Sequence, residues 1–425
     1  MASVLAEKII VPPRMVRVRQ LFDGPPGLKD IRLEVQRALT PLKLPSRIKP
    51  GDTVAITAGS RGIANIAIII KTVGDELKAI GAKPFIVPSM GSHGGATPAG
   101  QVDILRHFGI TEESMGVPIK SSMDVVEIGE TLGFPVYLSK VASEADHIAV
   151  VGRVKPQIGL NIEIGSGIHK MLAIGLGKRK GASTYHRAMI HYGYPKVIQH
   201  VGQEVLKRAK IVFALGIVEN AYAQTAKIEA ALPHEVEQKA RELLQLAKSW
   251  MMKLPFSEVD VLIVDEIGKN ISGDGMDTPI IGRFTDPLDH TTEPKVSRIV
   301  VLDLTEDTYG NAVGIGMADL TTKRLVDKID RQATYINALT GHAPEGAKIP
   351  PYFDSDREAV DVALSTIGMI EPESARVIHI KNTKYMDEVE VSEVYLPLMK
   401  NRKDLVQLSE PKELQFDSQE NLQRL

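Results

Sequence analysis

Short apolar runs alternate with amphipathic segments along most of the chain. Runs rich in Val and Ile predict strands over residues 53–57, 82–88, 148–151, 211–218, 259–264, 299–304 and 377–380. Apolar residues at helical spacing predict helices over residues 65–80, 233–252, 320–329 and 355–368. Thr97 can cap a helix that has Pro98 at its first position, so we expect another helix there, ending at Phe108.

This alternation of strands and helices predicts an α/β fold with mostly parallel sheets. Near-continuous Val and Ile, without strict alternation, is typical of strands that are buried on both faces. A long helical pattern ends near residue 252, Pro255 follows, and a new strand begins near residue 259. We therefore expect two α/β domains, residues 1–255 and 256–425. The polar segment after Arg402 predicts a loose extension or a strap across a neighbour.

Composition narrows the classes of function. The 51 basic and 53 acidic residues give a net charge of −2, which argues against a nucleic-acid protein held by bulk positive charge. Zero cysteine excludes disulfides, thiolate nucleophiles and cysteine-bound metal sites. No apolar run reaches the roughly 18 residues of a membrane span, and the first residues lack the apolar core of a signal peptide. The expectation is a cytoplasmic protein without a membrane segment.

Loops that follow strands carry most of the candidate chemistry, because ligands of open α/β sheets bind at the carboxyl ends of strands. Arg61 lies in such a loop and suits a phosphate or carboxylate, although a tight turn with a solvated arginine fits the local sequence equally well. His93 lies among three glycines and suits acid–base chemistry near neutral pH. The alternative for His93 is a surface histidine in a flexible loop.

Two lysines are further candidates. Lys170 lies among apolar residues, whose burial would lower the pKa of its amine and make it nucleophilic; the alternative is a basic surface helix. Lys269 follows the first strand of the second predicted domain and suits a substrate anion, or is an ordinary surface lysine. Nearby, Asp274 and Asp277 do not have the spacing of a calcium-binding loop. We expect them instead at the polar edge of a cleft between the two predicted domains.

Taken in order, these segments resemble the nickel-pincer-nucleotide-dependent lactate racemase family and its homologues. The resemblance covers roughly residues 10–400 and rests on the motifs at 59–62, 91–97, 166–178 and 271–277 together with His186. It implies an active site between two α/β domains and a racemase or epimerase that moves hydride from a small 2-hydroxyacid. The implied cofactor is a pyridinium mononucleotide that grips nickel through two sulfur-bearing substituents and a ring carbon.

The motifs also imply roles for single residues. Lys170 resembles the lysine to which the cofactor is covalently joined, and His186 resembles the protein ligand of nickel. Arg61 resembles the arginine that holds the cofactor phosphate. His93 resembles one of two catalytic histidines, and Lys269 resembles a lysine that helps to bind the substrate. Sulfur would then reach the metal through the cofactor, so a chain without cysteine is compatible with a sulfur-ligated nickel site.

Gln157 departs from the family, because many relatives carry a catalytic histidine there. Glutamine cannot take up a proton at neutral pH, so either another group such as His169 substitutes, or the reaction is one-sided, or racemase activity is lost. Two alternatives stay open: a non-catalytic binder of a nucleotide or hydroxyacid, and a phosphate-ester isomerase that uses His93 and Arg61. The expected partners are the hydroxyacid substrate and the proteins that make the cofactor; the oligomeric state is left open.

Overall fold

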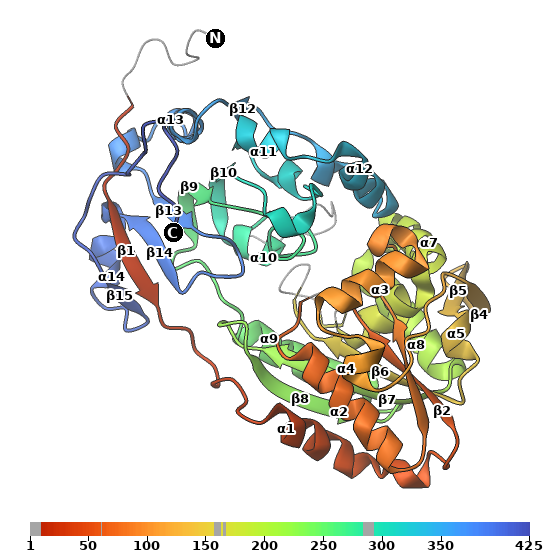
Figure 1. Ribbon diagram of the computed structural model, residues 1–425. Helices are drawn as coiled ribbons and strands as arrows, with labels where there is room; N and C mark the ends of the chain where they lie inside the picture. Colours follow the sequence, from red (N-terminus) through yellow and green to blue (C-terminus); the bar gives the residue numbers. More distant parts are fainter. Residues whose placement is uncertain (1–9, 61, 157–162, 165–166, 284–292) are drawn as a thin grey trace.

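The computed structural model describes residues 10–60, 62–156, 163–164, 167–283 and 293–425. Two sheets, each covered by helices, make a mixed α/β fold in which most neighbouring strands are parallel (Figure 1). This confirms the predicted fold class. None of the helices within these ranges is long and apolar enough to cross a bilayer.

The first sheet has the order β3-β2-β6-β7-β8. Its strands are β2 (Thr53–Ala58), β3 (Lys83–Pro88), β6 (His147–Arg153), β7 (Ile211–Glu219) and β8 (Thr225–Ala231). The first four are parallel, and β8 runs antiparallel to β7. All four strands predicted in this half of the chain are therefore present and pair in one sheet.

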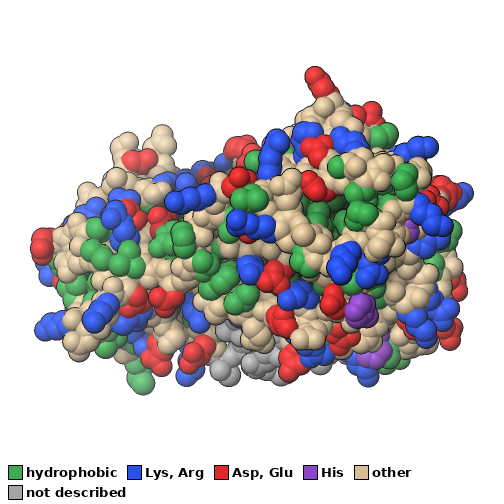
Figure 2. Space-filling model, turned by 90° about the horizontal axis from the view of Figure 1, so that it is seen from below, with side chains coloured by type: hydrophobic (Ala, Val, Ile, Leu, Met, Phe, Trp, Pro, Cys, Tyr) green, Lys and Arg blue, Asp and Glu red, His purple; other side chains and the backbone are tan. Residues whose placement is uncertain are grey.

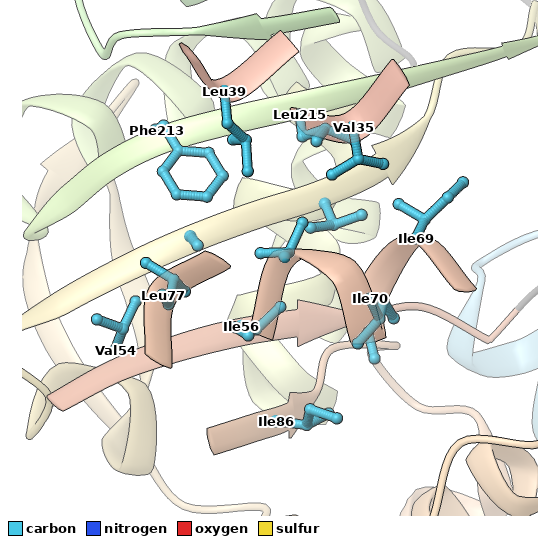
Figure 3. Close-up of a cluster of buried hydrophobic side chains, with 14 of the residues drawn as sticks. Val35, Leu39, Val54, Ile56, Ile69, Ile70, Leu77, Ile86, Phe213 and Leu215 are labelled. Atoms are coloured by element: carbon cyan, nitrogen blue, oxygen red, sulfur yellow. The ribbon is translucent and has the colours of Figure 1, made fainter. Parts of the chain in front are cut away.

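Helices cover both faces of the first sheet, which explains the near-continuous apolar strands. Val54 and Ile56 of β2 pack against α1 (Ile31–Leu39) and α2 (Ile66–Ala79), in the cluster that Figure 3 shows. Ala55, between them, points to the opposite face, which is covered by α7 (Leu176–Tyr192) and α8 (Tyr194–Arg208). A hairpin of β4 (Val125–Thr131) and β5 (Phe134–Ser139) packs beside α7.

The second sheet has the order β12-β11-β10-β9-β13-β14-β1-β15. Its strands are β1 (Met15–Gln20), β9 (Glu258–Val264), β10 (Lys295–Val301), β11 (Leu320–Thr322), β12 (Tyr352–Phe353), β13 (Val377–Ile380), β14 (Glu388–Ser392) and β15 (Leu405–Gln407). Strand β1 comes from the start of the chain and lies between β14 and β15 (Figure 1). Strand β1 of the second sheet therefore precedes every strand of the first sheet in the sequence.

Four longer helices remain among the described residues. They are α3 (Pro98–His107), α9 (Val236–Ser249), α12 (Arg331–Thr340) and α13 (Asp356–Ser365). Thr97 caps α3 as expected, since its hydroxyl accepts a hydrogen bond from the Gly100 N–H. Acidic and basic side chains are mixed over the face in Figure 2, as the small net charge suggests.

Two sequence predictions are wrong. Residues 320–329 do not form one helix: Leu320–Thr322 is strand β11, and a short helix, α11 (Lys323–Asp327), follows it. Thr322 ends the strand and caps the helix, because its hydroxyl accepts from the Leu325 N–H. The polar tail after Arg402 also does not extend away, because β15 pairs with β1 and Leu422 is buried in the chain's own C-terminal core.

A buried ionic cluster joins three neighbouring strands of the second sheet. His379 of β13 lies between Asp265, just after β9, and Glu390 of β14, with N···O distances of 2.8 and 3.1 Å. Burial acts to lower the pKa of His379, but the hydrogen bonds to both carboxylates outweigh it and raise the pKa to about 9. The C-terminal tail joins the cluster through Arg424, which pairs with Asp265. A protonated His379 therefore balances two buried carboxylates.

We predict that His379→Gln destabilises the protein by about 3–5 kcal/mol, because it removes the cation that lies between the two buried carboxylates of Asp265 and Glu390. The His379 pKa is raised, so its contribution is complete below the unfolded-state value of about 6.5 and is lost as the pH rises through about 9. Calorimetry between pH 6 and 10 should show this loss in the unaltered protein and a flatter profile in the variant. His234→Gln, at an exposed position, is the control; matching profiles for all three proteins would contradict the prediction.

Candidate active site

A cavity of about 740 Å³ lies between the two sheets and is lined by residues from both halves of the chain. That volume suits a bound small molecule. Its first wall is formed by the loops after β2, β3 and β6, where parallel strands end, and by residues 167–194. Its second wall comes from the loop after β9 and from α12 with the segment that follows it. The cavity therefore lies where ligands of α/β sheets are expected.

His93 reaches the cavity from the loop after β3. The loop turns tightly at Gly91 and Gly94, whose φ angles are +59° and +66°. A Cβ atom at Gly94 would lie 2.5 Å from the carbonyl carbon of Gly100 at the start of α3, so only glycine fits there. The turn at Gly94 thus brings the loop close to the start of α3.

Lys170 and His186 lie on one irregular helical segment. It consists of α6 (Ile168–Lys170), a π-helical turn η4 (Met171–Gly175) and α7. Leu172 and Leu176 turn into the core behind the first sheet, while Lys170 and His186 line the cavity. The apolar residues around Lys170 thus anchor the segment to the sheet and leave its polar face on the cavity. A π-helical turn is a frequent feature of functional sites.

His186 is enclosed and held neutral. Burial, followed by the positive charges of Lys170 and His342, lowers the pKa of His186 to about 4. Its Nδ1 lies 3.3 Å from the carbonyl oxygen of Thr340, in α12 on the opposite wall. If Nδ1 carries the proton and donates to that carbonyl, the Nε2 lone pair is available to a metal. The ring therefore has the protonation state that a metal ligand needs.

Lys269 lines the second wall, and its Nζ donates to the carbonyl oxygen of Gly273. Beside it, Asp277 crosses the cleft. Its carboxylate pairs with Lys155 of the first wall at 2.5 Å and accepts a hydrogen bond from Ser272 at 2.8 Å. Asp274 also lines the cavity. The two aspartates thus lie at the edge of the cavity between the two halves of the chain. Asp277 connects the halves through its ion pair with Lys155.

The structure brings His93, Lys170, His186 and Lys269 to one cavity. Arg61 and Gln157 lie outside the described residues. Among the residues that are described, no three His, Asp or Glu side chains form a cluster that could hold a metal ion. The resemblance assigns one protein ligand to the metal, so the expected site does not need such a cluster.

His169 does not line this cavity. Its fully buried ring packs over Gly202 of α8, where a Cβ atom would lie 2.7 Å from a ring carbon. Neither ring nitrogen has a hydrogen-bond partner among the described residues. Burial lowers the pKa of His169 to about 4, so the ring is neutral. The hypothesis that His169 replaces the missing catalytic histidine is therefore not supported.

Sequence reasoning missed Tyr194, Asn337 and His342, which also line the cavity. Tyr194 is buried, and its hydroxyl has no hydrogen-bond partner among the described residues, so a ligand acceptor would satisfy it. Tyr194 and His342 each follow a glycine at the end of a helix. A glycine at the end of a helix is therefore the sequence signal for both residues.

Comparison with known proteins finds a likeness for the first half of the chain. Residues 25–196 match the family model of the lactate racemase N-terminal domain. They include Lys170, His186 and the His93 loop. This part of the chain is therefore similar to the N-terminal domain of lactate racemases. No match is found among the curated proteins.

Comparison with solved structures extends the similarity in fold to the second half of the chain. The structure titled "lactate racemase apoprotein from Thermoanaerobacterium thermosaccharolyticum" aligns with a TM-score of 0.53 and 14% identity. The alignment covers 87% of this chain and 98% of that one. At that identity the likeness is one of fold alone. It places Lys269 and α12, which lie beyond residue 196, in a chain that follows the overall lactate racemase-like architecture.

We predict that Asp277→Asn weakens the contact between the two halves by about 1.5–3 kcal/mol, the usual value of a hydrogen bond to a charged group. Lys155 would lose its carboxylate partner across the cleft. Small-angle X-ray scattering should then report a larger radius of gyration, with faster amide exchange around residues 153–156. Asp274→Asn removes the same charge three residues earlier and is the control. Equal radii and exchange rates in both variants would refute a tying role for Asp277.

Proposed function

We propose that this chain is a racemase or epimerase of a small 2-hydroxyacid that works with a nickel-pincer nucleotide bound at Lys170. The observation that carries the proposal is the convergence of His93, Lys170, His186 and Lys269 on one cavity between the two halves of the chain. The match of residues 25–196 to the lactate racemase N-terminal domain supports a racemase-type activity. The hydride chemistry, the metal and the substrate class come from the resemblance described above.

The residues of the cavity suit that cofactor. Lys170 offers a primary amine for covalent attachment, and His186 is a neutral imidazole on the same helical segment. Tyr194 adds a buried hydroxyl that lacks a partner among the described residues, as expected where a ligand supplies one. The cavity of about 740 Å³ has room for a mononucleotide beside a small acid. When bound, the cofactor would supply the hydride acceptor.

The side chains would orient the substrate and move its proton. Lys269 lies on the wall opposite Lys170 and would pair with the substrate carboxylate. His93, in the loop after β3, would take the proton of the substrate hydroxyl at its own side of the cavity. The Lys155–Asp277 pair would hold the two walls together around the bound acid and exclude water. In this proposal Arg61 holds the cofactor phosphate.

Gln157 favours a second candidate function, a homologue that binds a nucleotide or hydroxyacid without turnover or with altered chemistry. Racemisation needs proton transfer at both faces of the substrate, and an amide cannot take up a proton at neutral pH. His169, buried away from the cavity, does not fill the gap. A melting shift with a hydroxyacid, without any turnover by the cofactor-loaded protein, would favour this function.

The first prediction is that protein made in a host with the cofactor-biosynthesis proteins carries nickel and an added mass on Lys170. Lys170→Arg keeps the positive charge but lacks a nucleophilic amine, so the adduct should disappear completely. Intact-mass spectrometry and metal analysis measure both quantities. Lys207→Arg, at an exposed position on α8, is the matched control and should keep the adduct. An unmodified Lys170 and no nickel in the unaltered protein would exclude this cofactor.

The second prediction concerns the missing histidine. Gln157→His restores a group that can take up and release a proton, and acid–base catalysis contributes about 10²-fold or more in rate. The variant should therefore racemise an accepted hydroxyacid about 10²-fold faster than the unaltered protein, measured by chiral chromatography. Gln157→Asn is the control and should give no gain. If the histidine variant gains nothing on any accepted substrate, the account of Gln157 is wrong.

A further inference from the structure

Lys178 has an unusual backbone and an unusual location. It is fully buried within α7, and its φ and ψ angles are +54° and −159°. A residue other than glycine pays about 1–3 kcal/mol for such a conformation, which persists only where the surroundings impose it. Burying an ammonium group also costs free energy, and burial lowers its pKa to about 8. The strained backbone and the buried ammonium group both cost free energy, so we expect the hydrogen bonds of this side chain to matter for the structure around it.

Those hydrogen bonds lead to the His93 loop. The Nζ atom of Lys178 donates to the carbonyl oxygen of Pro88, the last residue of β3, and to Oε1 of Gln101 at 3.1 Å. Gln101 is fully buried in α3. Its Nε2 donates in turn to the carbonyl oxygens of Gly91 at 3.0 Å and His93 at 3.4 Å. The Gln101 amide oxygen thus accepts a hydrogen bond from Lys178, and its nitrogen donates to the loop.

This chain of hydrogen bonds connects the parts of the proposed site. Lys178 belongs to the same helical segment as Lys170 and His186. The loop also touches that segment directly, since a Cβ atom at Gly91 would lie 3.0 Å from Ile174. Lys178 therefore links the loop, through Gln101, to the segment that carries Lys170 and His186.

We propose that Lys178 is a positioning residue, which acts through Gln101 to hold His93 at a fixed place relative to Lys170 and His186. Lys178 is not among the residues that line the cavity. The inference rests on the proposed function for its catalytic consequence, but the geometry of the loop can be tested without it. A misplacement of about 1 Å in a catalytic group can cost about 10²-fold in rate.

The experiment compares two single variants. Lys178→Met removes the ammonium group and keeps an unbranched chain. Gln101→Glu keeps an oxygen acceptor for Lys178 but removes the amide donor to the loop, so it tests the same link without emptying the lysine site. In the apoprotein, amide exchange over residues 89–97 should rise by about tenfold in both, since local opening sets that rate. Lys207→Met, at an exposed position, should leave exchange unchanged.

The cofactor-loaded enzyme supplies the second readout. Both variants should lower kcat by about 10–10²-fold while KM and nickel content stay unchanged, because His93 is displaced and the binding groups are not. The double variant should be no slower than the slower single variant. Unchanged exchange over residues 89–97 in Gln101→Glu would overturn the proposal, even if Lys178→Met fails to fold. Absence of turnover in the unaltered protein would instead refute the proposed function and leave the exchange result decisive for Lys178.

Discussion

Parallel pairing of β3, β2 and β6 is the constraint on which the site depends. Because their carboxyl ends meet at one edge, three loops that are distant in the sequence open into the same cavity. The sheet is buried on both faces, so a shift in strand register would disrupt the packing of both cores. The second sheet presents β9 and its loop to the same space, and the walls meet through Lys155 and Asp277.

The segment from α6 to α7 shows how packing serves chemistry. Its apolar side chains, such as Leu172 and Leu176, anchor it to the sheet, which leaves Lys170 and His186 on the opposite face. The contact of His186 with Thr340 then joins this face to α12 of the other half. Electrostatics follow from the same arrangement, since enclosure among positive groups keeps the imidazole neutral.

Local signals could be read from the sequence, and non-local ones could not. The apolar strands of the first sheet and the Thr97 cap were predictable, because burial and capping leave marks within a few residues. The helix predicted over residues 320–329 failed because pairing with β10 overrode the helical pattern at Leu320–Thr322. Tyr194 and His342 reach the cavity only through tertiary folding. The sequence motifs predict His93, Lys170, His186 and Lys269 as site residues. The structure shows that all four line one cavity.

Strand β1 has a consequence for the order in which the chain can fold. Arg14, beside β1, pairs with Glu393, 379 positions further along. The strands of the first sheet all lie between Thr53 and Ala231, so that sheet can close while most of the second is still being synthesised. Until β14 and β15 emerge, β1 has neither neighbour. The second sheet is therefore the slow, late-closing part, and the cavity between the two sheets can be completed only after it closes.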